Sequence, residues 1–286
     1  MATFFEDKLV VITGGSSGIG RALARALASE GARLVLIATN EARLSDAAKE
    51  CAQLGATVTT YTANVASFEQ MQAAYEQTCR EHGTPDILIN NAGVVMGGEL
   101  VAVDLEDWRR LLDINVMGVV HGLKLFLPDM ISRGSGHVVN VSSAAGLLAP
   151  PLMSTYCATK FAVVGLSDSL RREVSRHGIG VTCVCPGTTR TPIKDKVKLV
   201  GWAGSERGEK HVRDMFETST LTPDDVAQKT LAGIRRNDPV VLVGKEAHLA
   251  SDRPDATFVR SAPAAAHAFR LGLARGSTAH GPRRAD

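Results

Sequence analysis

A phenol and an ammonium group lie four residues apart in the stretch Tyr156-Cys157-Ala158-Thr159-Lys160. In a helix, that spacing places Tyr156 and Lys160 on one face. A free tyrosine has a pKa of about 10, too high for efficient proton exchange at neutral pH, and a nearby cation lowers it by stabilising the phenolate. The pair suits a general acid/base. The alternative is a tyrosine and a lysine that simply lie on an exposed helix face.

Hydroxyl groups precede this pair at the end of an apolar run, in Asn140-Val141-Ser142-Ser143. The run from His137 to Val141 predicts a strand, so the serines lie at its carboxyl end. A serine there can hydrogen-bond a substrate oxygen while a phenol exchanges the proton. The alternative is an ordinary helix-capping serine.

Glycines in the pattern Gly-x-x-x-Gly-x-Gly follow the first apolar run and open a helical pattern. A bound pyrophosphate needs backbone N–H donors, the positive end of a helix and no side chain in the way. Glycines also cluster in plain turns, but a strand before and a helix after favour a dinucleotide site. Its candidate residues are Gly14, Ser16, Ser17, Gly18, Ile19 and Gly20.

The end of the second apolar run, Ala38-Thr39-Asn40, carries no carboxylate. An acidic residue at this place would hold the ribose hydroxyls of NAD and repel the 2′-phosphate of NADP. Thr39, Asn40 and Ser16 could hold that phosphate, together with Arg43 one turn into the next helix. Arg43 on a solvated helix face is the alternative. The sequence therefore favours NADP(H) over NAD(H).

Short apolar runs alternate with longer amphipathic segments along the chain, which predicts βαβ crossovers and a parallel sheet covered by helices on both faces. The expected strands are Leu9–Thr13, Arg33–Ala38, Thr57–Thr62, Asp86–Asn90, His137–Val141, Gly180–Cys185 and Val240–Val243. The expected helices are Ile19–Ser29, Glu41–Leu54, Ser67–His82, Leu105–Met130 and Ser154–His177. The fold class is α/β, a Rossmann-like doubly wound sheet.

These motifs occur together and in order. They are the glycine turn, Asn90-Asn91-Ala92-Gly93, Asn115, Ser143, Tyr156 with Lys160, and Pro186-Gly187. From about residue 8 to residue 243 the chain closely resembles the short-chain dehydrogenase/reductase family. The resemblance implies one Rossmann-like domain with a seven-stranded sheet. It also implies hydride transfer between a nicotinamide cofactor and an alcohol or ketone carbon, in dimers or tetramers built on two long helices.

The resemblance also implies a role for each matching residue. Tyr156 would be the acid/base, and Ser143 rather than Ser142 would position the substrate oxygen, because it lies thirteen residues earlier. Lys160 would bind the nicotinamide ribose and lower the tyrosine pKa, and Asn115 would support a water in a proton relay. The residues beside the cofactor would be Asn91, Ala92, Gly93, Pro186, Gly187 and Thr191.

One departure from the family pattern follows the third strand. The family usually has Asp-Val there, with the aspartate reaching the adenine, whereas this chain has Asn64-Val65. Because an amide can still hydrogen-bond the base edge, we expect binding with modest loss at most.

The main rival to an enzyme is a non-catalytic dinucleotide-binding scaffold or sensor of the same fold. The presence of all four proton-transfer residues, Asn115, Ser143, Tyr156 and Lys160, favours the enzyme. The apolar segment 147–153 suits a pocket for a hydrophobic ketone or secondary alcohol, although it could instead line a sheet edge or a subunit interface.

Two segments interrupt the alternation. Residues 188–220 mix charged and apolar side chains after a strand end, and they are either a substrate lid or a surface insertion. We expect a single catalytic domain over residues 1–247. The remainder, 248–286, is expected to be a disordered or weakly structured tail, although 264–275 could form a basic amphipathic helix.

The composition is that of an ordinary globular protein, with 44% hydrophobic and 22% charged residues. A net charge of +2 gives no reason to expect nucleic acid as a partner. We find no apolar run of the roughly 20 residues that span a bilayer, and no secretory signal in Met1–Asp7. We expect the five cysteines to be free thiols rather than metal ligands, with Cys183 and Cys185 on opposite faces of a strand. A cytoplasmic protein is expected.

Overall fold

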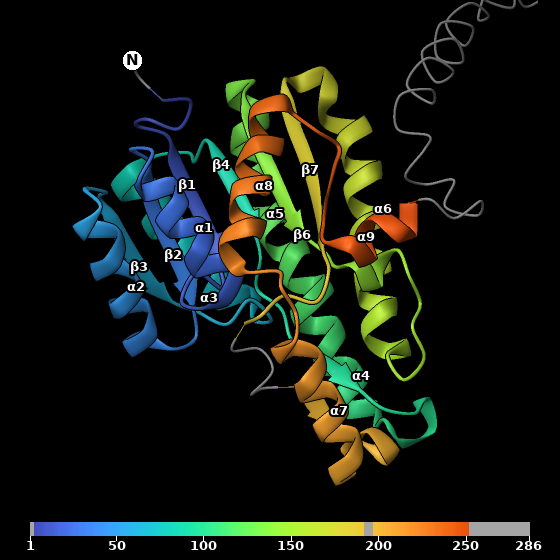
Figure 1. The fold of residues 1–286 in the computed structure, drawn as a ribbon. Helices are drawn as coiled ribbons and strands as arrows, with labels where there is room; N and C mark the ends of the chain where they lie inside the picture. The colour runs from blue at the N-terminus through green and yellow to red at the C-terminus, as the bar shows by residue number, and fades with distance from the viewer. Residues whose placement is uncertain (1–2, 192–196, 252–286) are drawn as a thin grey trace, which may run out of the picture.

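The computed structural model describes residues 3–191 and 197–251. Seven strands, each parallel to its neighbours, form one sheet in the order β3-β2-β1-β4-β6-β7-β9 (Figure 1). The strands are β1 (Leu9–Thr13), β2 (Arg33–Ala38), β3 (Val58–Thr62), β4 (Ile87–Asn90), β6 (Gly136–Val141), β7 (Ile179–Pro186) and β9 (Val240–Val243). The predicted α/β fold is confirmed, and every predicted strand end lies within one residue of the observed end.

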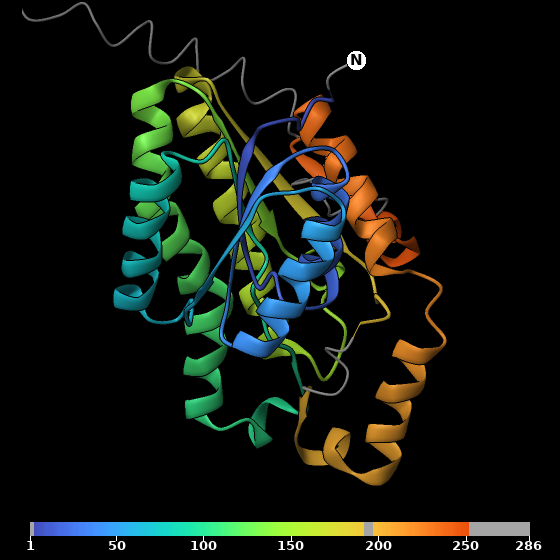
Figure 2. The same cartoon turned by 90° about the vertical axis from the view of Figure 1, so that its left-hand side faces the viewer.

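Helices cover both faces of the sheet, as Figure 2 shows from the edge. They are α1 (Gly18–Ala28), α2 (Glu41–Gln53), α3 (Phe68–His82), α4 (Leu105–Leu112), α5 (Gly118–Arg133), α6 (Ser154–Val174), α7 (Glu206–Glu217), α8 (Pro223–Arg236) and α9 (Lys245–Ser251). Alternate residues of β1 enter different cores. Val10 packs with α1, α2 and α8, and Val11 packs with α3, α5 and α6. Burial on both faces explains the continuous apolar runs.

The chain reverses its direction of winding between β1 and β4. These strands are neighbours, with Val10 paired to Ile87, but β1 leads to β2 on one side and β4 leads to β6 on the other. The loops that follow β1 and β4 therefore lead to opposite sides of the sheet from its carboxyl edge, which is where doubly wound folds bind ligands. The glycine turn and Asn91-Ala92-Gly93 belong to these two loops.

The predicted single helix 105–130 is longer and is interrupted. A π-helical turn over Asp113–Met117 separates α4 from α5. Within the described residues, the whole stretch Leu105–Arg133 is long and apolar enough to cross a membrane by length and composition, which corrects our expectation that no such run exists. Its residues Val119 and Phe126 are buried in the core against the sheet, so we interpret it as a core helix.

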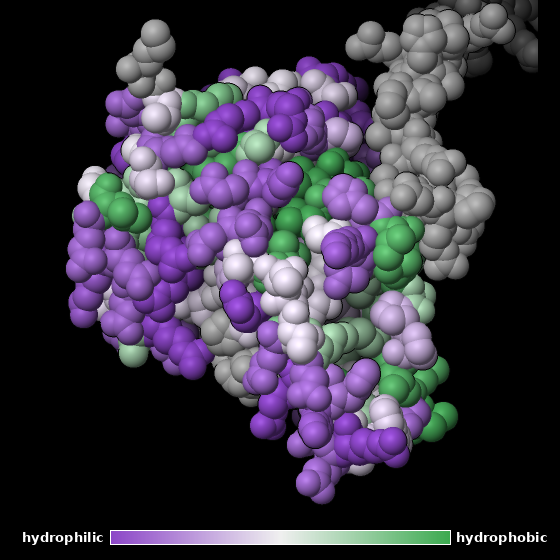
Figure 3. Space-filling view, viewed as in Figure 1, coloured by the Kyte–Doolittle hydropathy of each residue, from purple (hydrophilic) through white to green (hydrophobic). Residues whose placement is uncertain are grey.

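A second, two-stranded sheet was not predicted. It pairs β5 (Met96–Gly97) with β8 (Lys198–Leu199), which lie about a hundred residues apart in the chain. Strands of two residues carry no periodic signal. The helix α7 also lies inside the segment that was predicted as a lid or insertion, and the surface that it presents in Figure 3 is mostly hydrophilic.

Helix α9 runs across the predicted domain boundary at residue 247. The rest of the predicted tail, from residue 252, lies outside the described residues, as does the candidate amphipathic helix 264–275.

The placement of Cys183 and Cys185 corrects the sequence analysis. Side chains two residues apart on a strand share a face, and their Sγ atoms lie 3.9 Å apart. Both thiols are buried and free beside Val164 of α6. Among the described residues, no group of three or more His, Cys, Asp or Glu side chains is placed to hold a metal ion.

His137 predicts an acid-sensitive step in stability. Burial, with a smaller contribution from Arg171, lowers the pKa of His137 to about 4. In the unfolded chain the His137 side chain has a pKa of about 6.5, so it binds a proton at pH values at which the folded chain does not. The free energy of unfolding therefore falls as the pH drops below 6.5. We expect a loss of roughly 2 kcal/mol between pH 7 and pH 5. His137→Gln should flatten this dependence in urea unfolding, and equal losses in both proteins would contradict the assignment.

Candidate active site

The glycine turn between β1 and α1 has a backbone shape that favours glycine. Gly14 and Gly18 have φ angles of 68° and 53°, a region that side chains disfavour. A Cβ on Gly20 would lie 2.3 Å from the carbonyl oxygen of Gly14. Ser17, the N-cap of α1, makes no side-chain capping bond. The first N–H groups of α1 therefore have no side-chain acceptor from their cap, and this suits an anion.

The loop after β4 holds the glycine turn in place. Asn91 Nδ2 donates to the carbonyl oxygens of Thr13 at 3.0 Å and Gly14 at 3.3 Å. Thr13 Oγ1 accepts from the backbone N–H groups of Asn91 and Ala92. Asn91 thus fixes the glycine turn, a contact that motif spacing could not reveal, and its place beside the cofactor stays a prediction.

The remaining predicted residues of the turn and Thr191 have packing contacts. Ser16 is buried, and Ile19 packs against the core shared by α1, α2 and α8. Thr191 lies over the turn, because a Cβ on Gly18 would be 3.5 Å from Thr191 Cβ. The segment after β7 therefore reaches the N-terminus of α1.

Thr39, Asn40 and Arg43 are exposed at the end of β2 and the start of α2. Asn40 Oδ1 accepts from the backbone N–H of Arg43 at 2.9 Å, so Asn40 caps α2. This cap was missed in the sequence analysis, although an Asn before a helical run is its usual signal. The contacts of Thr39 and Arg43 with a 2′-phosphate stay a prediction.

Asn64 and Val65 follow β3 and differ in exposure. Asn64 Oδ1 accepts from Ala66 N–H at 3.1 Å, which closes a local turn before α3. Val65 is buried, and a Cβ on Gly118 of α5 would lie 2.8 Å from Val65 Cγ2. The contact of Asn64 with adenine stays a prediction.

Tyr156 and Lys160 lie on the buried face of α6, with 8% and 5% of their surface exposed, which removes the interpretation as surface residues. Lys160 Nζ lies 5.8 Å from the centre of the Tyr156 ring. It donates to the carbonyl oxygen of Val141, at the end of β6, at 3.0 Å. The sheet edge thus fixes the ammonium group beside the phenol ring.

The structure separates the two serines after β6. Ser142 Oγ is buried and donates to the carbonyl oxygen of Lys160 at 2.9 Å, so it ties β6 to α6. Ser143 Oγ accepts from Ala145 N–H at 3.1 Å and caps a short 3₁₀ turn over Ala144–Gly146. Ser143 is thus a cap as well as the serine beside Tyr156.

Burial sets the proton affinities of the pair. It raises the pKa of Tyr156 to about 12, and a hydrogen bond with Ser143 offsets only part of that rise. Burial also lowers the pKa of Lys160 to about 8. The pKa of Tyr156 is therefore raised and not lowered as expected from the nearby Lys160, because desolvation of the phenolate is the largest cause. Tyr156 is protonated at neutral pH and is ready to donate.

Asn115 lies in the π-helical turn and is buried. Its Oδ1 accepts from Val94 N–H at 2.8 Å, and its Nδ2 donates to Val94 O at 2.9 Å and Thr159 Oγ1 at 3.1 Å. The amide thus holds the loop after β4 against α6. A Cβ on Gly93 would lie 3.2 Å from Asn115 Oδ1 and 3.5 Å from Lys160 Nζ. Single π turns often mark functional sites, but the relay through Asn115 stays a prediction.

Pro186 and Gly187 lie where β7 reaches the same carboxyl edge. Pro186 pairs with Val243 of β9, and Gly187 N–H donates to Val243 O at 2.7 Å. A Cβ on Gly187 would lie 2.5 Å from Glu246 Oε2, so the flexible side chain of Glu246 on α9 packs against this glycine.

A family model described as short chain dehydrogenase matches residues 8–199. The chain belongs to the short-chain dehydrogenase/reductase family. EphD of Mycobacterium bovis, named as a probable oxidoreductase, is 36% identical over 256 residues, which are 86% of this chain and 42% of EphD. This dehydrogenase therefore spans less than half the length of EphD. SadH of Mycobacterium tuberculosis, likewise named only as an oxidoreductase, is 37% identical over 85% of this chain and 88% of its own.

A solved structure supports the same assignment. The short-chain dehydrogenase/reductase of Burkholderia phymatum in complex with NAD is 31% identical, with a TM-score of 0.79 over 98% of this chain and 99% of its own. The resemblance noted in the sequence is thus confirmed, and the solved relative binds NAD.

The residues of this dehydrogenase fit a dinucleotide. At Gly14 and Gly20 an added Cβ would meet neighbouring atoms at 2.8 and 2.3 Å, so these places favour bare backbone, and at Gly93 it would lie 3.2 Å from Asn115 Oδ1. The uncapped start of α1 and Thr191 would hold the pyrophosphate. Lys160 would hold the nicotinamide ribose.

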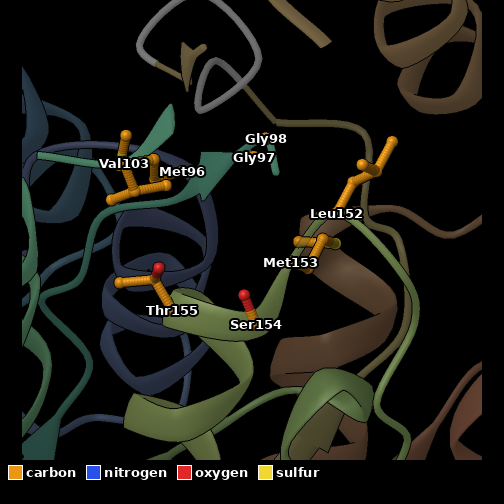
Figure 4. A pocket seen from close by; sticks show the side chains of 8 residues that line it. All are labelled: Met96, Gly97, Gly98, Val103, Leu152, Met153, Ser154 and Thr155. Atoms are coloured by element: carbon orange, nitrogen blue, oxygen red, sulfur yellow. The ribbon is translucent and has the colours of Figure 1, made fainter. Parts of the chain in front are cut away.

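A small apolar pocket, shown in Figure 4, is lined in part by residues of the apolar cluster that contains Tyr156. It is lined by Met96, Gly97, Gly98, Val103, Leu152, Met153, Ser154 and Thr155. The predicted apolar segment 147–153 supplies only Leu152 and Met153, since Leu147 packs against the two cysteines of β7. Met96 and Val103 were missed because a two-residue strand and the end of a short 3₁₀ turn carry no periodic signal. Met96, Val103 and Met153 share one apolar cluster with Tyr156.

The predicted lid partly roofs this pocket. Its strand β8 pairs with β5, whose two residues line the pocket. Lys198 Nζ lies 2.7 Å from a carboxylate oxygen of Asp107 on α4, and Trp202 N–H donates to Glu99 Oε2 at 3.0 Å. Trp202 remains about half exposed. The described part of residues 188–220 thus has features of both interpretations, a substrate lid and a surface insertion.

Proposed function

We propose that this dehydrogenase interconverts a secondary alcohol and a ketone on a hydrophobic substrate, with Tyr156 as the acid/base. The observation that carries the proposal is a buried, protonated Tyr156 beside Lys160 and an apolar pocket. The nicotinamide, when bound, supplies or accepts the hydride. Ser143 holds the substrate oxygen. Tyr156 gives its proton to that oxygen during reduction, and the Lys160 charge stabilises the phenolate that remains.

Two measurements test the proposal. Titration with NADPH and with NADH, followed by nicotinamide fluorescence, should show binding, and a panel of hydrophobic ketones should then be reduced with the preferred cofactor. Cofactor binding without turnover of any ketone or secondary alcohol would favour the scaffold or sensor. Absence of binding of either cofactor at millimolar concentration would contradict the dinucleotide site itself.

We also propose NADP(H) as the preferred cofactor, on the exposed Thr39 and Arg43 and the absence of a carboxylate from Ala38-Thr39-Asn40. The variant Thr39→Asp places a negative charge where the 2′-phosphate would lie. It should shift the ratio of kcat/KM values toward NADH by about tenfold or more, since each 1.4 kcal/mol corresponds to a factor of ten. Thr39→Asn has the same shape without the charge and should change the ratio little. Equal ratios in both variants would contradict this placement.

We propose a homodimer or homotetramer in the cytoplasm. Leu112 and Met117 on the long helix and Phe161 on α6 are exposed by 39%, 41% and 44%, and large apolar side chains on two neighbouring helices favour burial in an interface. The five cysteines, all free, fit a reducing compartment. Light scattering of the purified protein measures the oligomeric state.

A further inference from the structure

Thr155, the residue before Tyr156, has a buried hydroxyl without a hydrogen-bond partner. Its side chain is 3% exposed. In the described part of the protein, only Thr155 Oγ1 and Asn90 Oδ1 are buried side-chain polar atoms that lack a partner. The Asn90 amide bonds Asn140 through its nitrogen. A buried hydroxyl with no bond destabilises a fold, so Thr155 requires an explanation.

Other buried threonines on helices use their hydroxyls within the helix. Thr78, Thr159 and Thr230 donate to carbonyl oxygens three or four residues earlier, at 2.7, 2.8 and 2.7 Å. Thr155 lies in the first turn of α6, where the preceding residues are not helical and offer no such carbonyl. Its hydroxyl is therefore directed elsewhere.

The hydroxyl faces the pocket beside Tyr156. In Figure 4 the oxygens of Thr155 and Ser154 point to the side of the pocket where Met96 and Val103 lie. The N-cap of α6, Met153, makes no side-chain capping bond. The first N–H groups of α6 thus lack an intrahelical acceptor, and they lie at the positive end of a 21-residue helix.

This corner of the pocket offers hydrogen-bond donors within an apolar wall. The Thr155 hydroxyl and the start of α6 donate, while Met96, Val103 and Leu152 exclude water. No cation is among the lining residues, so a neutral acceptor suits the corner better than a carboxylate.

We propose that Thr155 determines substrate specificity by binding a second, neutral carbonyl oxygen of the substrate. This inference rests on the proposed ketone reduction. The first carbonyl lies at Tyr156 and Ser143, and the second, from an ester or a further ketone, accepts from Thr155 and the start of α6. Keto esters and diketones are therefore preferred over simple alkanones.

The cover formed by β5 and β8 is consistent with a Thr155 hydroxyl that gains its hydrogen-bond partner only when the substrate binds. The pocket has no room for even one water molecule, whereas typical ligand sites have roughly 300–1,000 Å³. A substrate that enters must move β5 and β8, which pair over only two residues each. The Thr155 hydroxyl is shielded from water while β5 and β8 cover the pocket, and it gains a hydrogen-bond acceptor when the substrate binds.

The test compares matched ketones. The probes are keto esters with the ester one, two or three carbons from the ketone, and 2-alkanones of the same chain length. In the wild type, kcat/KM should favour at least one keto ester over its alkanone. Thr155→Val should reduce that preference about 3- to 10-fold, as expected for one neutral hydrogen bond, and Thr155→Ser should restore it. An unchanged preference in Thr155→Val overturns the proposal.

Stability provides a second readout that does not require activity. Replacing an unpartnered hydroxyl with a methyl group should raise the Tm of Thr155→Val by about 2 °C or more. Thr230→Val is the matched control, because it removes a buried hydroxyl that has a partner, and its Tm should fall. A fall of similar size in Thr155→Val would show a structural role for the hydroxyl and overturn the proposal.

The two proposals fail in different ways. A wild type that binds cofactor but reduces none of the probes contradicts the proposed function. In that case, the Tm measured in the presence of both cofactor and keto ester tests whether Thr155 binds the substrate. A rise above cofactor alone in the wild type, absent in Thr155→Val, supports the subsite, and no rise in the wild type overturns it.

Discussion

Tyr156→Phe should reduce kcat for ketone reduction by about 10² to 10⁴ while cofactor binding stays within a few fold of the wild type. The change keeps the buried ring that packs with Met96 and Val103 and removes only the hydroxyl. Because the pKa of Tyr156 is raised to about 12, the phenol carries its proton at neutral pH and is the donor that the variant lacks. Steady-state kinetics with the preferred cofactor measure the loss.

The matched control for this change is Tyr75→Phe. Tyr75 also bonds through its hydroxyl, which donates to Asp129 at 2.7 Å between α3 and α5, away from the pocket. Its loss should leave kcat unchanged within about twofold. Similar losses in both variants, or near-normal turnover in Tyr156→Phe, would remove Tyr156 from the acid/base role.

Gly20→Ala should raise the Kd of the dinucleotide at least tenfold and destabilise the fold by about 1–3 kcal/mol. The added Cβ would lie 2.3 Å from Gly14 O and 2.5 Å from Asn91 Nδ2. Both atoms belong to the contact that fixes the glycine turn, so the turn must shift. Fluorescence titration and urea unfolding measure the two effects.

Gly165→Ala is the matched control, since Gly165 is also a helical glycine but has nothing within 4 Å of an added Cβ. Gly165→Ala should raise the free energy of unfolding by about 0.5–1 kcal/mol and leave the cofactor affinity unchanged. A normal Kd in Gly20→Ala would show that the turn is not the phosphate site.

The sheet was predictable because its central strands are buried on both faces and its helices are amphipathic. Such patterns depend on neighbours along the chain, which a sequence displays. The placement of Tyr156, Lys160 and the glycine turn at one edge follows from parallel strands, whose carboxyl ends share an edge. The error at Cys183 and Cys185 was one of reasoning, because strand periodicity already places them on one face.

The remaining features depend on contacts between distant segments. The pairing of β5 with β8 involves two residues on each side, and the tie between Asn91 and Thr13 crosses 78 residues of sequence. The high pKa of Tyr156 results from burial by the whole fold, whereas the sequence showed only the nearby Lys160. The side-chain oxygens of Asn40 and Asn64 accept hydrogen bonds from backbone N–H groups nearby in the chain. Composition alone does not distinguish such local bonds from contacts with a ligand.

The π-helical turn at Asn115 has a consequence for insertions and deletions. A π turn accommodates about one extra residue in an α-helix, and each residue rotates the helix by about 100°. Asp107 on α4 faces Lys198 of the roof, whereas Phe126 on α5 faces the sheet. Removing one residue from Asp113–Met117 would therefore rotate α4 relative to α5. The chain could then keep the packing of Phe126 against the sheet or the contact of Asp107 with Lys198, but not both. The length of this short segment is as constrained as its composition.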